Sequence, residues 1–104
     1  MLNINFEFRK GIFFLRLSGS LNKETYQQKE QEIKQLIIQN KFKYIVINTN
    51  NLNNIDLDGL NCIIKLCHIT EENQSNLVIC DKSNIFKRLL NNNFPNINDE
   101  LEVL

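Results

Sequence analysis

The stretch Tyr44-Ile45-Val46-Ile47-Asn48, followed by Thr49 to Asn54 and then by Ile55-Asp56-Leu57-Asp58-Gly59-Leu60, decides how this chain folds. Its first part is an apolar, β-branched run, which predicts a buried strand. The Asn-rich segment 49–54 predicts a loop, and the acidic turn after it predicts the start of an amphipathic helix. Free backbone N–H groups and the helix dipole gather at such a start. A carboxylate there marks a candidate site.

The residues before this stretch predict a hairpin and a helix. Apolar residues alternate with polar ones over 4–8, and Phe13, Leu15 and Leu17 alternate with Phe14 and Arg16, which predicts two strands with Lys10-Gly11 as the turn between them. Asn22 is a suitable N-cap. From there the pattern predicts one helix that continues to Asn40.

The residues after it predict two more units of strand and helix. The helix that opens at Asp58 runs to about Glu72, and 76–80 reads as a buried strand. Ser83 is a candidate cap for a short helix over 85–90, which 91–93 and Pro95 would end. A strand near Ile97 and a short terminal helix follow. The spacing of Leu101 and Leu104 predicts that these two side chains dock that helix.

The resulting order of elements indicates an α/β fold. Strands that are separated by helices need crossover connections, which predicts a mixed sheet of four or five strands with helices packed on it. The chain has 104 residues, of which 42% are hydrophobic. This suits a single domain over 1–104 with one core.

Composition excludes several classes of partner and places the chain in the cytoplasm. The formal net charge is zero, which argues against nucleic acid and anionic membranes as partners. No apolar run approaches the roughly 20 residues that span a bilayer, so we expect no direct membrane insertion. The three cysteines are an odd number, which indicates reduced thiols and a cytoplasmic location. They are Cys62, Cys67 and Cys80.

No catalytic or metal-binding pattern stands out. Asp56 and Asp58 lack a His, a Lys or a third acid at a useful spacing, and the single histidine is His68. Cys62, Cys67 and His68 do not follow a zinc spacing. The three glycines are too scattered to form a phosphate loop. We therefore expect no enzyme activity, no metal and no cofactor.

The helix after Asp58 carries two apolar stripes. At about 100° per residue, one stripe faces the core. Its members are Leu60, Ile63, Ile64 and Cys67. A second stripe on roughly the opposite side consists of Cys62, Leu66 and Ile69. The second stripe is either buried under a neighbouring element or forms an apolar patch that faces a partner.

The chain resembles the STAS domains, a family of bacterial anti-sigma-factor antagonists, over nearly its whole length. Its turn Asp56-Leu57-Asp58-Gly59-Leu60 stands where the family usually has Asp-Ser-Ser-Gly-Leu or Asp-Ser-Ala-Gly-Leu. Its segment 19–22 stands where the family has Gly-x-Leu-Asp. The resemblance implies the same mixed sheet.

The resemblance also implies a function, which is docking onto an anti-sigma factor of the serine-kinase type. Asp58 occupies the position of the family's phosphoacceptor Ser, so the switchable hydroxyl is missing. Asp56 has a structural interpretation as a helix cap. The alternative role is that of a constitutive STAS subunit in a transporter-associated or stress-signalling assembly. The predicted partner-binding residues are Gly19, Ser20, Leu21, Asn22, Asp56, Leu57, Asp58, Gly59, Leu60, Cys62, Leu66 and Ile69.

Overall fold

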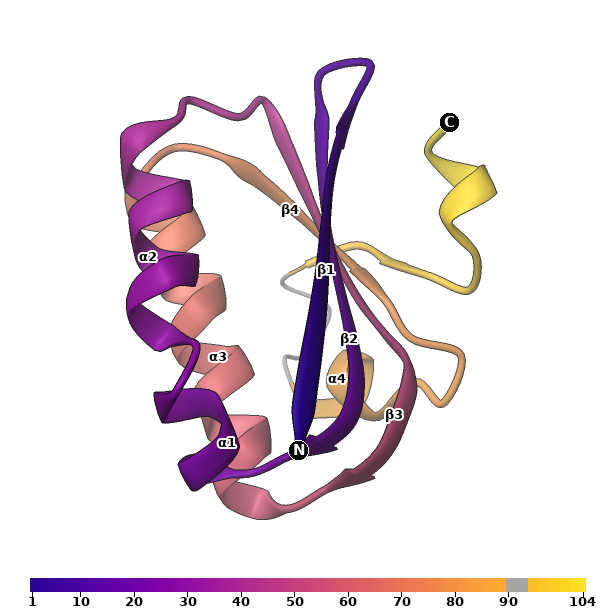
Figure 1. Ribbon diagram of the computed structural model, residues 1–104. Helices are drawn as coiled ribbons and strands as arrows, with labels where there is room; N and C mark the ends of the chain where they lie inside the picture. The colour runs from indigo at the N-terminus through magenta and orange to yellow at the C-terminus, as the bar shows by residue number, and fades with distance from the viewer. Residues whose placement is uncertain (90–93) are drawn as a thin grey trace.

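A five-stranded mixed sheet is the centre of the computed structural model, which describes residues 1–89 and 94–104. The strands lie side by side in chain order (Figure 1). They are β1 (Leu2–Arg9), β2 (Ile12–Leu21), β3 (Tyr44–Ile55), β4 (Asn76–Cys80) and β5 (Asn96–Ile97). β1 and β2 form an antiparallel hairpin, and each later pair is parallel. The α/β class and the mixed sheet predicted from the sequence are confirmed.

Helices cover one face of the sheet (Figure 1). They are α1 (Lys23–Gln27), α2 (Glu30–Gln39) and α3 (Leu57–Glu72). The short helix α4 (Ile85–Leu89) follows β4, and the 3₁₀ turn η1 (Glu100–Glu102) lies on the opposite side of the sheet. Within the described residues, no helix is long and apolar enough to cross a membrane.

Two apolar clusters hold these layers together. The main core lies between the sheet and the helices and includes Leu15, Ile47, Ile63 and Leu66, all fully buried. A smaller cluster on the other face consists of Phe14, Val46, Val78 and Cys80, with Ile12, Ile97 and Val103 packed against it. The segments 13–15 of β2, 45–47 of β3 and 77–80 of β4 are buried on both faces of the sheet and are continuous apolar runs.

The single helix predicted from Asn22 to Asn40 is wrong, because the chain divides it into α1 and α2. Asn22 caps α1, as predicted, but the helix ends at Gln27 and α2 begins at Glu30. The Lys29 N–H bonds to the Tyr26 carbonyl at 2.9 Å, which tightens the turn. Residues 27–29 are all polar, so no apolar side chain holds this turn against the core.

The loop predicted over 49–54 is also wrong, because β3 continues through it to Ile55. The extension pairs with the end of β2, with register shifts between Arg16 and Ser18 and between Gly19 and Ser20. Backbone pairing with a neighbouring strand does not require apolar side chains. Leu52 and Ile55 still pack against the main core, which fixes the extended strand in place.

The C-terminal segment docks differently from the prediction. The strand near Ile97 is confirmed as β5, but the terminal helix is only η1, and Leu101 and Leu104 are exposed. The contacts are made instead by Val103 and by Glu100, which forms a bidentate pair with the Arg16 guanidinium. The proposed helix end at 91–93 lies outside the described residues.

Candidate functional site

The turn between β3 and α3 is built around Asp56. This residue is extended and is the N-cap of α3, and its Oδ1 accepts a hydrogen bond from the Gly59 N–H at 2.8 Å. Its carbonyl accepts from the Leu60 N–H at 3.0 Å. These bonds satisfy the free end of the helix. The interpretation of Asp56 as a cap is confirmed.

The end of β2 holds this turn in place. The Asp56 N–H donates to the Leu21 carbonyl at 3.3 Å. A Cβ on Gly59 would overlap the Leu21 carbonyl oxygen and lie 2.8 Å from its carbonyl carbon. Only a glycine therefore allows α3 to approach β2 this closely. The contact brings together the two predicted segments, 19–22 and 56–60.

The first of these segments is fixed by its own hydrogen bonds. Asn22 and Thr25 form a reciprocal capping box, with distances of 2.9 and 3.0 Å. The Thr25 hydroxyl also donates to the Ser20 carbonyl at 2.9 Å. Gly19 has φ of +90°, and a Cβ there would overlap the Met1 carbonyl. The segment is therefore a rigid neighbour for the turn.

The predicted site residues divide into exposed and buried groups. Asp56, Leu57 and Asp58 are exposed, with Leu57 at 72%. Leu21 and Gly59 are buried, so their role is to position the turn and not to present a side chain. A third group of predicted site residues is partly buried, and these residues border the exposed turn. It consists of Gly19, Ser20, Asn22 and Leu60.

Asp58 lies in the first turn of α3, as predicted. Its carboxylate is exposed and makes no hydrogen bond to another described residue. Because Asp56 already caps the helix, Asp58 is not needed for that purpose. The arrangement places two carboxylates and the Leu57 side chain on the outside of a fixed turn.

The second apolar stripe of α3 does not face outward. Leu66 is fully buried, Cys62 is 9% exposed, and Ile69 packs partly buried against the main core. α1 and α2 pack against this side of α3. The partner-facing patch is therefore wrong for Cys62 and Leu66, and the alternative of burial under a neighbouring element is confirmed. On the core-facing side, Ile64 is only half-buried.

The cysteines of α3 and β4 are buried free thiols. Burial raises the pKa of the Cys67 thiol to about 12 and that of the Cys80 thiol to about 11. Burial also raises the pKa of the Cys62 thiol, with smaller contributions from Glu30 and the carboxylates of the turn. Among the described residues, no three His, Cys, Asp or Glu side chains form a group that could hold a metal ion.

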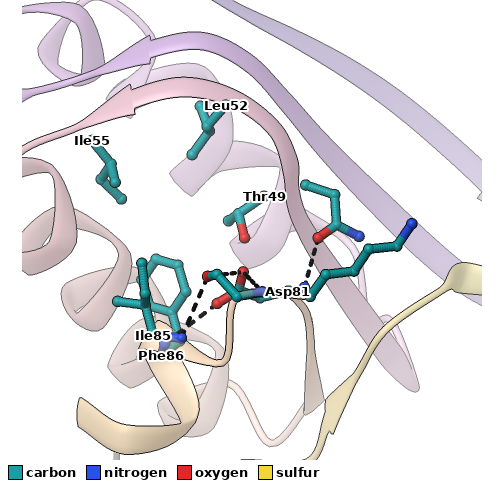
Figure 2. Close-up of a pocket in the computed structure, with 9 residues that line it drawn as sticks. Thr49, Leu52, Ile55, Asp81, Ile85 and Phe86 are labelled. Atoms are coloured by element: carbon teal, nitrogen blue, oxygen red, sulfur yellow. Dashed lines mark hydrogen bonds between the residues drawn. The ribbon is translucent and has the colours of Figure 1, made fainter.

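A groove that the sequence did not reveal adjoins the turn (Figure 2). It has a volume of about 280 Å³ and lies between the end of β3 and the connection from β4 to α4. Its apolar walls are Leu52, Ile55, Ile85 and Phe86. Ile55, which lines the groove, directly precedes Asp56 in the sequence, so β3 links the groove to the turn.

Buried Asp81 shapes this groove. Its Oδ1 accepts from the Ser83 hydroxyl at 2.6 Å and from the Ser83 N–H at 3.1 Å. Its Oδ2 accepts from the Phe86 N–H at 3.4 Å. Ser83, the predicted cap of this helix, thus donates to Asp81, and its hydroxyl also accepts from the Ile85 N–H at 3.4 Å. The sequence signal that could have indicated a polar site here is the acidic residue directly after the buried strand 76–80.

Comparison with known proteins identifies the family. The model of the STAS domain family matches residues 3–93. The chain belongs to the STAS domain family. This STAS domain is 27% identical over 89 residues to an anti-sigma F factor antagonist from Paenibacillus polymyxa, covering 86% of this chain and 76% of the relative.

Solved structures of similar proteins share the fold. The anti-sigma factor antagonist SpoIIAA in its unphosphorylated form has a TM-score of 0.78 at 17% identity, covering 97% of this chain and 93% of that one. A putative anti-sigma factor antagonist from Thermotoga maritima has a TM-score of 0.80 at 11% identity, covering 96% and 90%. At these identities the likeness concerns the fold alone.

Proposed function

We propose that this STAS domain is a non-enzymatic anti-sigma-factor antagonist of the cytoplasm. Its partner is an anti-sigma factor of the serine-kinase type, which docks on the turn 56–60 and on the neighbouring segment 19–22. The observation that carries this proposal is an exposed acidic turn held rigidly against the end of β2. The name of the Paenibacillus relative supports the choice of partner.

Asp58 gives this docking surface a fixed charge. A phosphoserine carries about −1.5 to −2 charges, whereas Asp carries −1 and is smaller. Asp58 is therefore a permanent, partial imitation of a phosphorylated residue. Since the turn contains no hydroxyl group, a kinase cannot phosphorylate it. Peptide mapping after incubation with kinase and ATP checks this, and a phosphate beside the turn would mean that the acceptor had moved.

The groove next to the turn extends the proposed surface. Four of its lining residues are apolar, and one of them, Ile55, is next in sequence to the turn. An apolar side chain of the partner fits this chemistry, with the charged turn setting its orientation. Docking then combines one buried apolar contact with polar contacts at the rim.

Calorimetric titration with purified anti-sigma F factor tests the proposal. A partner that releases phosphorylated antagonists should bind Asp58→Ser about tenfold more tightly than the parent, because a charge is removed from a site built for a neutral hydroxyl. A partner that pairs with Asp58 through its own Lys or Arg should instead bind the variant more weakly. Asp58→Ala serves as the matched control without a hydroxyl.

Two results would contradict the proposal. The first is that neither the parent nor any Asp58 variant binds the anti-sigma factor. The second is unchanged affinity for both Asp58 variants together with a lower melting temperature, since Asp58 would then act only on the stability of the helix. Asp56→Asn reports the cap separately, because it affects the bond to the Gly59 N–H.

A second candidate function follows from the missing hydroxyl. A constitutive STAS subunit of a larger assembly, either transporter-associated or for stress signalling, needs a docking surface but no phosphorylation switch. Asp58 suits that role. In that case mass spectrometry of a pull-down should identify subunits of a transporter or of a stress-signalling assembly, whereas the first candidate function predicts an anti-sigma factor.

A further inference from the structure

The edge of the sheet at β1 is open. β1 pairs with β2 on one side only and forms the near edge of the sheet in Figure 1. Among the described residues, no side chain or backbone group bonds to its outer side. Proline and charged side chains are common protections of an exposed edge; the strand contains no proline, and its two charged residues, Glu7 and Arg9, lie at the end that leads into the hairpin turn. Such an edge can pair with another strand.

The free backbone groups belong to the even-numbered residues. In an antiparallel pair, alternate residues direct both backbone groups toward the partner strand. The Ser20 N–H bonds to the Met1 carbonyl, which assigns the odd-numbered residues to the side of β2. Ile4, Phe6 and Phe8 therefore direct free N–H and C=O groups outward, whereas Leu2, which has the same orientation, is buried.

The same residues carry the apolar face of the strand. Leu2 is buried in the main core, and Ile4 and Phe6 pack partly buried against it. Phe8 is 62% exposed, although its ring lies 5.5 Å from that of Phe42. A groove of about 430 Å³ runs along Phe6 and Phe8. This apolar edge is thus only partly covered by its own chain.

The sequence of β1 is complementary to itself around Asn5. Antiparallel pairing about this residue places Ile4 opposite Phe6 and Leu2 opposite Phe8, with apolar side chains on the same face. On the other face, Glu7 lies opposite Asn3, and Asn5 lies opposite its own copy. No charged residue of the strand faces a like charge, which would oppose pairing.

We propose that β1 is a dimerisation edge whose partner is a second copy of this chain, paired antiparallel about Asn5. The two sheets then form one continuous sheet through a two-fold, self-complementary contact. Outward N–H and C=O groups of Ile4 and Phe6 bond between the copies, and the exposed Phe8 ring reaches Ile4 of the second copy diagonally. This proposal is independent of the docking surface at Asp58.

Directed disulfide formation in the full chain tests the register. In the proposed pairing the two Asn5 residues form a pair without backbone hydrogen bonds, with Cα atoms about 4.5 Å apart, which suits a disulfide. The two Asn3 residues lie roughly 14 Å apart, because four residues of strand separate them. After mild oxidation, Asn5→Cys should give at least about tenfold more linked dimer than Asn3→Cys.

The matched control keeps this test specific. Both variants replace an exposed Asn of the same strand, Asn5 being the one that accepts a hydrogen bond from the Arg16 guanidinium at 3.0 Å, and the native cysteines are buried. The parent chain should therefore stay unlinked under the same conditions. Equal yields from the two variants, or no linked dimer from either, would overturn the proposed pairing.

Sedimentation equilibrium tests the apolar contact without any cross-link. Phe8→Lys should raise the dimer dissociation constant at least tenfold, whereas Leu101→Lys should leave it unchanged. Leu101 is a matched control, because it is 75% exposed and lies in η1 on another part of the surface. Equal effects of the two variants, or a parent chain that stays monomeric up to about 1 mM, would overturn the proposal. Melting curves confirm that each variant is folded.

Discussion

Replacing Gly59 by Ala should loosen the turn at the start of α3. The added methyl group would lie 2.8 Å from the carbonyl carbon and 3.1 Å from the Cγ of Leu21, where an ordinary contact between carbon atoms is about 3.5–4.0 Å. Such overpacking costs about 1–3 kcal/mol, and loss of the bond from the Asp56 N–H adds about 1 kcal/mol. Alanine recovers up to about 1 kcal/mol of helix propensity.

The net expectation for Gly59→Ala is a loss of about 2 kcal/mol in the free energy of unfolding. For a domain of this size that lowers the melting temperature by roughly 10 °C. Urea denaturation measures the first quantity, and hydrogen exchange at the Asp56 amide reports the local loosening. Asn61→Ala is the control, because Asn61 is exposed on the same helix. A Gly59→Ala protein as stable as the parent would refute the close approach of α3 and β2.

Two further predictions concern groups away from the turn. The Tyr26 hydroxyl is buried without a hydrogen-bond partner, so Tyr26→Phe should stabilise the protein by about 1 kcal/mol in thermal melts; a loss of stability would mean that the hydroxyl has a partner. The hydrogen bond from Arg16 lowers the pKa of the Glu100 carboxyl in the folded protein. The stabilisation that this bond gives is complete above the unfolded pKa of about 4.3 and is lost as the pH falls through the lower folded pKa. Glu100→Gln should therefore be less stable by about 1 kcal/mol at pH 7, with the difference disappearing in acid; a constant difference down to pH 2, on the order of two pH units below the unfolded pKa, would contradict the assignment.

Apolar runs and caps were sufficient to predict most of the fold. The buried strands β3 and β4 follow from their β-branched residues, and the Asp56 cap follows from its place before an amphipathic helix. The extension of β3 over 49–54 was missed because its pairing with β2 is a backbone interaction, which polar side chains do not reveal.

The candidate site was predictable as a turn but not as a surface. Periodicity shows that Cys62 and Leu66 are apolar, but it does not show that α1 and α2 cover them. The groove at Asp81 depends on two segments far apart in the sequence, and local pattern gives no measure of such distances. Tertiary packing therefore decided the points at which the sequence was ambiguous.

The capping bonds at Asp56 and Asn22 have a consequence for the thermodynamics of docking. Both ends of the proposed surface are already ordered, through the bond to Gly59 and the capping box with Thr25. This STAS domain therefore loses little conformational entropy when a partner binds, and more of the interaction free energy remains as affinity. Any large entropy loss measured on association would have to come from the partner.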